Sequence, residues 1–404
     1  MMHHGMTPAK RVYFDYNATT PIHPAVREAL VESFEVYGNS SSVHGFGREA
    51  HSMVEDARSD VASLIGATAH SVVFTGGGSE SNNTVLRIPA CGHTGCAQFS
   101  SHRRGLVTST IEHPSVLNTA QALASTGTPV TYVNVEATGK ISLPELEDAL
   151  TEDVALVSIM MANNEIGTIQ DIRTVSRMAH DHGVLVHTDA VQAVGKIPVH
   201  VDELGVDFLS LSGHKFGAPK GIGALYAKSD VPFCALIQGG HQESGRRAGT
   251  LNTQGIIGIG RAAKVNLAEG EAERRRIFGL RERLREGIVS TIPDIRVNGH
   301  PTDCLPGTLN VSFRGVEGEA ILLYLDLEGI AVSTGSACAS GSLDPSHVLL
   351  ATGVGAELAH GSIRFSIGFL STEDEVDYVV EKIPPIIGRL RTMSTVYATV
   401  GGAV

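Results

Sequence analysis

The chain has 404 residues, of which 42% are hydrophobic and 18% are charged, a composition typical of a folded globular enzyme. Its 31 Lys and Arg residues against 43 Asp and Glu residues give a formal net charge of −12, which argues against direct nucleic-acid binding because that function needs a cationic surface. No apolar run reaches the length of a membrane span, and the N-terminus lacks the layout of a secretory signal. We therefore expect a cytoplasmic protein without membrane contact.

Apolar runs of strand length alternate with helical patterns up to about residue 260. The runs are rich in Val, Ile, Leu or Phe and show little polar alternation, as expected when helices cover both faces of a parallel sheet. The predicted strands lie within residues 71–80, 153–160, 183–190 and 206–213. Segments between them, such as 143–150 and 174–183, have helical spacing, and Gly183 is placed to end the second of these helices.

The pattern changes near residue 256, where a long polar helix is predicted to run to residue 288. Further strands are predicted within 307–313, 330–338 and 362–368, and Thr372 followed by Glu375 forms a capping box at the start of a final helix. We therefore predict an α/β fold with a mainly parallel sheet in a large domain, residues 21–260. Residues 1–20 and 261–404 are predicted to form a smaller α/β domain.

Polar residues follow each predicted strand of the large domain. Ligands of open parallel sheets bind outside the carboxyl ends of the strands, so these residues are expected to share one site. They are Thr75, Gly76, Gly77, Gly78, Ser79 and Glu80 after the first strand, Asn163 and Asn164 after the second, Asp189 after the third, and His214 and Lys215 after the fourth.

The turn Gly76–Ser79 joins a strand to a helix. Free backbone N–H groups and the positive end of the helix dipole hold anions such as phosphate at such a junction. The turn matches neither the dinucleotide-binding pattern nor the P-loop. An ordinary tight turn without a ligand is an equally good interpretation of this stretch alone.

Asp189 and Lys215 supply two further groups. A carboxylate at the end of an apolar strand must be paired or hydrogen-bonded, so Asp189 is either a helix N-cap or a partner for a cationic ring nitrogen. Lys215 is either a surface lysine or an amine that forms an imine with an aldehyde, and its neighbours Gly213, Gly217 and Pro219 favour a shaped loop. An anion site, an acid and an imine-forming lysine together match pyridoxal 5'-phosphate (PLP).

The sequence resembles the cysteine desulfurases, which have the fold type I structure of PLP-dependent transferases and belong to the class V aminotransferases. It is most similar to the branch that includes the housekeeping iron–sulfur assembly and nitrogen-fixation enzymes. The resemblance spans nearly the whole chain and rests on "YFDYNATTP", "TIEHPSVL", "NNEIGTIQD", "HTDAVQAVGK", "SGHKFGAPKGIGALY", "RRAGTLN", "STGSACASGSLDPSHVL" and "SIRFSIG".

The resemblance implies a role for each matching residue. Lys215 forms the imine with PLP, His113 stacks on its ring, Asp189 faces the ring nitrogen, and Gln192 bonds the phenolic oxygen. The phosphate is held by Gly78, Ser79, Ser212 and His214, with Thr250 reaching it from the partner subunit of a homodimer. The carboxylate of the substrate L-cysteine is bound by Asn164 and Arg364. The nucleophile implied by the resemblance is Cys338.

The chemistry of desulfuration independently favours Cys338. A second thiolate must accept the substrate sulfur, which leaves a persulfide on the enzyme and releases alanine. Cys338 lies in the small-residue run "STGSACASGS", which suits a segment that moves between cofactor and acceptor. His113, with a pKa near neutrality, is a candidate proton carrier. Alternatively, Cys338 is a small buried residue, His113 a helix-start residue before Pro114, and Arg364 a strand residue with a surface ion pair.

Two stretches depart from the family pattern. The phosphate loop reads "TGGGSES", but Ser79 keeps the hydroxyl, so phosphate binding is expected to be intact. The segment 88–105 is longer than usual and contains Cys91, Cys96 and two histidines, yet their spacing fits no standard zinc site, so we expect no metal there. The five cysteines of the chain are an odd number, which argues against a disulfide framework.

Three hypotheses about function follow. The first is a cysteine desulfurase that passes sulfur to a protein acceptor or iron–sulfur scaffold, for iron–sulfur cluster assembly, tRNA thiolation or DNA phosphorothioation. The second keeps the fold and cofactor but has another reaction, as a selenocysteine lyase or an aminotransferase that leaves Cys338 idle. The third is a non-catalytic dimeric scaffold that docks sulfur-transfer partners.

Overall fold

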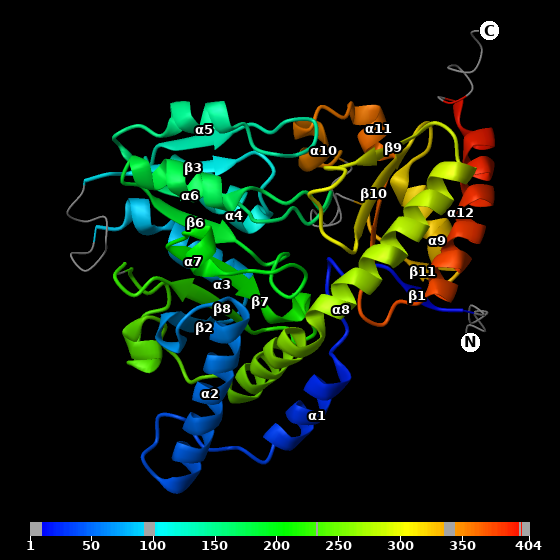
Figure 1. Ribbon diagram of the computed structural model, residues 1–404. Helices are drawn as coiled ribbons and strands as arrows, with labels where there is room; N and C mark the ends of the chain where they lie inside the picture. Colours follow the sequence, from blue (N-terminus) through cyan, green and yellow to red (C-terminus); the bar gives the residue numbers. More distant parts are fainter. Residues whose placement is uncertain (1–9, 93–101, 232, 335–343, 396, 398–404) are drawn as a thin grey trace, which may run out of the picture.

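The larger part of the molecule is built around a seven-stranded sheet (Figure 1). The structure is a computed structural model that describes residues 10–92, 102–231, 233–334, 344–395 and 397. Across the sheet the strands are β2 (Val72–Thr75), β8 (Gly223–Ala227), β7 (Phe208–Ser212), β6 (Leu185–Asp189), β5 (Val154–Ser158), β3 (Gly105–Ser109) and β4 (Val130–Val133). β8 runs antiparallel to both its neighbours, whereas the other strands are parallel to one another. The carboxyl ends of these six strands therefore meet at one edge.

Helices cover both faces of this sheet, as the continuous apolar strands predict. Neighbouring residues of one strand pack into different cores: Leu106 of β3 joins the core under α3 and α4, and Val107 joins the core under α2, α6 and the first half of α8. The helices of this part are α1 (Pro24–Ser33), α2 (Gly45–Leu64), α3 (Gly78–Leu86), α4 (Pro114–Ser125), α5 (Leu143–Ala149), α6 (Ile172–Asp181), α7 (Val201–Leu204) and α8 (Thr253–Thr291). Burial on both faces explains why the inner strands are mainly apolar, and the polar His187 and Ser210 inside β6 and β7 are paired with each other at 2.9 Å.

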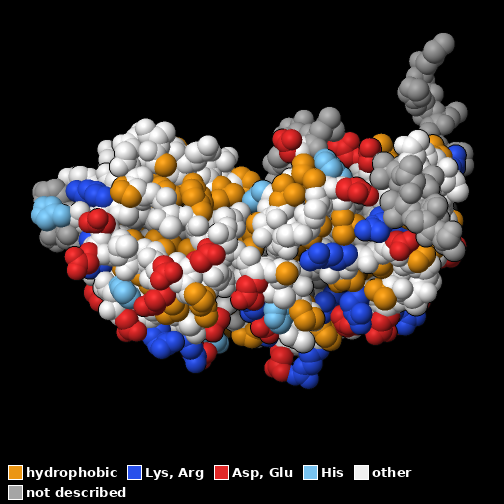
Figure 2. Space-filling model, turned by 90° about the horizontal axis from the view of Figure 1, so that it is seen from above, with side chains coloured by type: hydrophobic (Ala, Val, Ile, Leu, Met, Phe, Trp, Pro, Cys, Tyr) orange, Lys and Arg blue, Asp and Glu red, His pale blue; other side chains and the backbone are white. Residues whose placement is uncertain are grey.

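A smaller part lies beside the first (Figure 1) and contains two short sheets; Figure 2 shows the surface of both parts from above. Its strands are β12 (Ser362–Ser366), β10 (Thr308–Phe313) and β9 (Ile295–Asn298) in one antiparallel sheet, and β1 (Val12–Tyr13) and β11 (Ile330–Ala331) in the other. Its helices are α9 (Gly318–Leu327), α10 (His347–Ala351), α11 (Ala356–His360) and α12 (Glu373–Met393). Val12 and Phe14 lie in the same core as the second half of α8 and α12. This packing supports our proposal that residues 1–20 and 261–404 form the small domain.

The structure confirms the α/β fold with a mainly parallel sheet and refines its details. The predicted capping box of α12 is present, since the Glu375 N–H donates to Thr372 Oγ1 and the Thr372 N–H donates to Glu375 Oε2. The long helix α8 begins earlier than expected because the Asn252 side chain accepts from the Gly255 N–H and caps it there. In the described ranges, no helix is both long and apolar enough to cross a membrane.

Candidate functional site

A cavity of about 570 Å³ opens at the carboxyl edge of the large sheet. Ten of the predicted site residues line it: Gly78, Ser79, His113, Asn164, Asp189, Gln192, Ser212, His214, Lys215 and Arg364. They come from the ends of β2, β3, β5, β6 and β7 and, for Arg364, from β12 of the smaller part. Thr250 is exposed and is not part of the lining. Cys338 lies outside the residues that the structure describes.

The glycine turn before α3 forms one end of the cavity. Gly77 has φ +152°, which a side chain would strain, and a Cβ on Gly78 would come within 2.4 Å of Val191 Cγ2. Glu80 accepts from the Gly76 N–H at 2.8 Å and pairs with Arg247 at 3.0 Å, which holds the turn in place. The positive end of α3 and the nearby residues Ser212, His214 and Lys220 make this end of the cavity suitable for an anion.

His214 lines this end of the cavity with a neutral imidazole that can donate a hydrogen bond. Burial, followed by the charges of Lys215, Lys220 and Lys196, lowers the pKa of His214 to about 4. Its Nδ1 lies 3.2 Å from Thr19 Oγ1, and its backbone carbonyl accepts from the N–H of Thr20. The imidazole can therefore offer a hydrogen bond to an anion but carries no charge at neutral pH.

The Asp189 side chain accepts hydrogen bonds from neutral groups. Asn82 Nδ2 donates to its Oδ2 at 2.7 Å, and the Val191 N–H donates to its Oδ1 at 3.0 Å. The second contact resembles the N-cap alternative, although a turn and not a helix follows β6. Among the residues that the structure describes, the hydrogen-bond partners of Asp189 are neutral and none forms an ion pair with it, and the side chain lines the cavity. The carboxylate is thus suited to a cationic ligand group.

Lys215 projects from the short 3-10 helix Gly213–Lys215 that follows β7. Its Nζ donates to the backbone carbonyls of Asn17 and Ala18, each at 2.7 Å. Gly217, with φ +93°, supports the turn of the chain beyond it. These contacts fix the amine at the cavity wall, which is contrary to the surface-lysine alternative.

His113 is the N-cap residue of α4, so it does lie at the start of a helix before Pro114, as the alternative interpretation predicts. Its Nδ1 accepts from the Ser115 N–H at 3.1 Å and lies 2.8 Å from Ser115 Oγ. Because Nδ1 accepts from the backbone, the neutral ring carries its proton on Nε2. Burial is the largest cause that lowers the pKa of His113, so this neutral form prevails at neutral pH.

Arg364 lies at the boundary between the two parts of the molecule. Its Nη1 donates to the Asn164 carbonyl at 3.1 Å, and its Nη2 donates to Asp15 Oδ1 at 2.8 Å. The side chain is only 3% exposed, and its Nε is buried without a hydrogen-bond partner in the described structure. The ion pair predicted by the alternative interpretation therefore exists, but it is buried at the cavity. A guanidinium held in this way is well placed for a carboxylate.

We expect Arg364→Lys to weaken substrate binding selectively. A lysine keeps the positive charge but loses the fork of N–H donors that matches a carboxylate, so KM for an amino-acid substrate should rise about tenfold or more. Steady-state kinetics with L-cysteine, together with the absorption spectrum of the bound cofactor, checks this result. A fall in kcat with KM unchanged would contradict a carboxylate-binding role.

A buried acid, Glu112, lies directly before His113 in the chain. Its Oε1 accepts from Ser109 Oγ at 2.6 Å and from the Met160 N–H at 2.9 Å, whereas its Oε2 has no partner in the described structure. Burial raises the pKa of Glu112 from 4.5 to about 8. The side chain is therefore mostly protonated at neutral pH.

We expect Glu112→Gln to change how stability depends on pH. Between pH 4.5 and about 8 the folded protein binds more protons at this position than the unfolded chain, so the free energy of unfolding of the wild type falls as pH rises. The variant lacks this titration. As pH rises, its free energy of unfolding should therefore increase relative to that of the wild type by up to about 1.4 kcal/mol per pH unit. Urea unfolding of both proteins across this interval measures the difference. Parallel pH profiles would contradict the buried, protonated state.

The cysteines of the described chain lie apart from the cavity. Cys91 Sγ lies 3.1 Å from Cys234 Sγ, on the loop that follows β8, and Cys304 is a separate free thiol. Within the described ranges, no group of three His, Cys, Asp or Glu side chains is arranged to hold a metal ion. Cys96 and His93 fall outside those ranges.

Several residues of the site were not identified from the sequence. Asn17 contacts Lys215 and Gln192, Asn82 holds Asp189, Ser115 bonds His113, and Lys196 bonds Gln192. Asn17, Ser115 and Lys196 lie inside the family motifs, and this position in a motif could have identified them as site residues. Asn82 lies beyond the phosphate loop and had no signal of its own.

The chemical groups of the cavity fit PLP. A glycine turn that side chains would fill is suited to a phosphate, Asp189 to a cationic ring nitrogen, and the held amine of Lys215 to an aldehyde. The cavity brings these three groups together from segments that are distant in the sequence.

Comparisons with known proteins agree with this chemistry. The family model "Aminotransferase class-V" matches residues 12–379. The cysteine desulfurase IscS of Dictyoglomus turgidum is 46% identical over 386 residues, covering 95% of this chain and 96% of that protein. The cysteine desulfurase IscS of Methanosarcina thermophila is 45% identical, with 96% and 95% covered. A solved NifS-like protein superimposes with a TM-score of 0.87 at 40% identity, covering 94% of this chain and all of that one. The chain therefore belongs to the class-V aminotransferase family and, within it, to the PLP-dependent cysteine desulfurases.

Proposed function

We propose that the protein takes the sulfur atom of L-cysteine onto Cys338 and passes it from there to a protein acceptor or iron–sulfur scaffold. Membership of the cysteine desulfurases supports the reaction. The observation that carries the residue assignments is the single cavity that joins Lys215, Asp189 and the glycine turn. No observation favours the selenocysteine lyase, aminotransferase or scaffold alternatives.

The residues of the cavity divide into those that hold the cofactor and those that hold the substrate. Gly78, Ser79, Ser212 and His214 bind the phosphate, and Thr250 joins them from the partner subunit. Asp189 balances the cationic ring nitrogen, Gln192 donates to the phenolic oxygen, and His113 stacks on the ring. Lys215 attaches the cofactor through its amine. Asn164 and Arg364 bind the substrate carboxylate, which is supported by the buried guanidinium of Arg364.

Bound PLP supplies an electron-withdrawing ring that acidifies the α-carbon of an attached amino acid. Lys215 Nζ, oriented by the Asn17 and Ala18 carbonyls, carries protons to and from this carbon. His113 holds a proton on Nε2 because its Nδ1 accepts from Ser115. The thiolate of Cys338 then attacks the substrate sulfur: the substrate C–S bond breaks, an S–S bond forms, and proton delivery to carbon completes L-alanine.

An exposed apolar surface supports a homodimer. It lies on α1, α2 and the segment between them (Figure 1) and consists of Val31, Phe34, Tyr37, Val43 and Phe46, with Val43 89% exposed. Exposed apolar groups of this size mark protein contacts in soluble proteins. We propose that a second copy covers this surface. The face in Figure 2 carries both acidic and basic side chains. We propose that the enzyme acts in the cytoplasm on a protein acceptor.

The test begins with the purified wild-type protein. Borohydride should bleach its yellow colour and leave a reduced cofactor adduct, which mass spectrometry of the tryptic peptides should place on Lys215. L-Cysteine without a reductant should give L-alanine together with a persulfide mapped to Cys338. An adduct on another lysine would contradict the assignment. Mercaptopyruvate as product, which keeps the sulfur and loses the amino group, would favour an aminotransferase, and turnover of selenocysteine alone would favour the lyase.

A further inference from the structure

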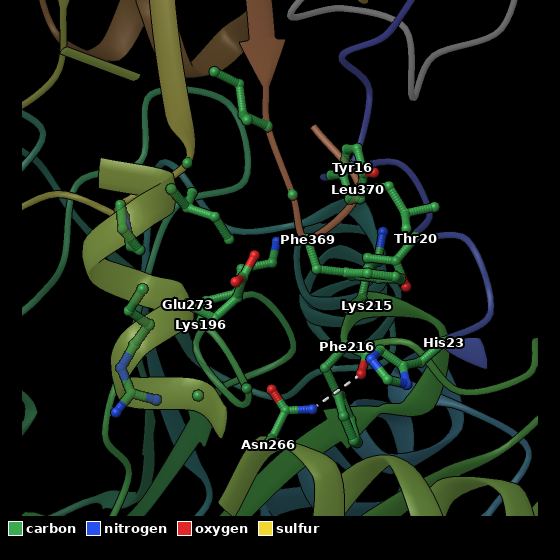
Figure 3. A pocket seen from close by; sticks show the side chains of 18 of the residues that line it. Tyr16, Thr20, His23, Lys196, Lys215, Phe216, Asn266, Glu273, Phe369 and Leu370 are labelled. Atoms are coloured by element: carbon green, nitrogen blue, oxygen red, sulfur yellow. Dashed lines mark hydrogen bonds between the residues drawn. The ribbon is translucent and has the colours of Figure 1, made fainter. Parts of the chain in front are cut away.

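A second lysine, Lys196, lies directly behind the wall of the PLP cavity. It follows β6 in the chain and lines a separate cavity of about 250 Å³, which Asn17 and Lys215 share with the larger one. Figure 3 shows Lys196 and Lys215 reaching this rear cavity from different segments, with Phe216, Asn266 and Phe369 around them. Lys196 therefore lies next to the site without lining the cavity that is suited to the cofactor.

The Lys196 amine contacts two amide side chains. Its Nζ donates to Gln192 Oε1 at 2.5 Å and to Asn17 Oδ1 at 2.8 Å. Gln192 Nε2 in turn donates to the Asn17 backbone carbonyl at 2.9 Å, and Lys215 Nζ donates to the same carbonyl. One short network thus links both lysines through Asn17 and Gln192.

These contacts decide which way each amide points. An amine can donate to an oxygen but cannot accept from an amide N–H when it is charged, so Lys196 fixes the oxygen ends of Gln192 and Asn17 toward itself. Gln192 Nε2 has two N–H groups, and the Asn17 carbonyl takes one of them. Toward the PLP cavity, Gln192 can therefore only donate a hydrogen bond.

The orientation of Asn17 has a parallel consequence. With Oδ1 held by Lys196, the Asn17 Nδ2 group donates to the Asn164 carbonyl at 3.0 Å and to Thr308 Oγ1 at 2.9 Å. Asn17 is only 3% exposed, so a reversed amide would leave buried groups facing like groups. The backbone of Asn17, which holds Lys215, is thereby tied to both parts of the molecule.

We propose that Lys196 is a positioning residue that fixes the Gln192 amide as a hydrogen-bond donor toward the cofactor's phenolic oxygen. The inference rests on the proposed function, in which that oxygen lies beside Gln192. If Lys196 is removed, the oxygen of the amide loses its donor, and only the contact of Nε2 with the Asn17 carbonyl opposes a half rotation that presents the oxygen to the phenolate. A donor stabilises the phenolate and an acceptor repels it.

The role does not require a charge on Lys196. Burial, followed by the charges of Lys215 and Arg364, lowers the pKa of Lys196 well below its ordinary value. A neutral amine has two N–H groups, and these face the two amide oxygens because the amide N–H groups of Gln192 and Asn17 donate to other acceptors. The geometric effect on Gln192 is therefore separable from any direct electrostatic effect on the cofactor.

The test is the pH titration of the yellow absorption of the holoenzyme, which reports proton loss from the cofactor's linkage to Lys215. A donor to the phenolic oxygen favours the deprotonated form, so Lys196→Met should move the midpoint upward by about one pH unit, a tenfold change in the equilibrium. Lys140→Met is the matched control, because Lys140 is also partly buried but pairs with Asp303, which is not a member of the network. Its midpoint should equal that of the wild type.

A double-mutant cycle separates the geometric role from a charge effect. Gln192→Met alone should shift the midpoint upward as Lys196→Met does, and adding Lys196→Met to Gln192→Met should produce little further shift. Additive shifts would overturn the proposal, since Lys196 would then act without Gln192. Should Lys196→Met not fold, Lys196→Gln keeps two N–H donors on a shorter side chain and should give a smaller shift in the same direction.

The two proposals fail in different ways. A yellow wild type whose midpoint is unchanged by the substitutions at Lys196 would overturn the positioning role and leave the proposed function in place. A wild type without the absorption would overturn both. A circular dichroism melt of each variant accompanies the titration, because a merely structural loss would lower the melting temperature without moving the midpoint.

Discussion

Lys215→Ala is expected to produce a folded protein that no longer attaches PLP covalently and whose rate of alanine formation from L-cysteine falls by about a thousandfold or more. The substitution removes the amine that the carbonyls of Asn17 and Ala18 hold at the cavity wall. Lys196 is close, but its Nζ is engaged by Gln192 and Asn17 behind the wall. Absorption spectra, borohydride reduction with peptide mapping, and alanine assays measure the result.

The control for this substitution is Lys228→Ala. Lys228 is a half-exposed lysine at the end of the neighbouring strand β8, and its ion pair with Asp207 is long at 3.9 Å. Removal of such a surface charge usually changes stability little, so this variant should keep the colour, the adduct on Lys215 and the activity. A Lys215→Ala protein that retains a borohydride-stable adduct at the wild-type level would contradict the assignment.

The residues that follow strands were predictable because a parallel sheet imposes their position. Asp189 and Lys215 each follow a continuous apolar run, and the carboxyl ends of parallel strands meet at one edge. The sequence therefore indicated that they share a site before their contacts were known. The capping box of α12 was predictable for a related reason, since Thr372 and Glu375 are close in sequence.

The partners of these residues depend on contacts that sequence spacing does not encode. Asn82 is 107 residues from Asp189, and Asn17 is 198 residues from Lys215. Either asparagine alone is compatible with an ordinary turn or helix surface. No strand was predicted over Gly223–Ala227, which form β8. Its antiparallel direction could not be predicted from composition, because its residues are as continuously apolar as those of the parallel strands. Strand direction depends on the connection, which here is a short loop after β7.

The orientation of amide groups also depends on contacts between residues that are distant in the sequence. The motif that contains Gln192 and Lys196 places them four residues apart, and this spacing alone does not say that their side chains meet. The contact arises because both reach Asn17, which comes from the N-terminal segment. Function in this region therefore depends on a network that assembles only when the two parts of the molecule pack together.

Cys338→Ala is expected to abolish the formation of alanine and sulfide from L-cysteine while the yellow colour and the adduct on Lys215 persist. Desulfuration requires a thiolate to accept the sulfur as the substrate C–S bond breaks. The methyl side chain of an alanine at position 338 cannot accept it. The residues that we propose to hold the cofactor come from the carboxyl edge of the large sheet, and the substitution leaves all of them unchanged. The substitution should therefore separate cofactor binding from sulfur transfer.

Cys304→Ala is the matched control, because Cys304 is a partly buried free thiol on a loop outside the cavity. This variant should form alanine and a persulfide at the wild-type rate, since loss of one sulfur at such a position affects stability and not the acceptor chemistry. Alanine formation by Cys338→Ala at the wild-type rate would show that another thiol, or an added reductant acting directly, accepts the sulfur. The rate of sulfide release would then depend on the concentration of that reductant. If Cys338 accepts the sulfur, the rate of the first turnover does not depend on the reductant concentration.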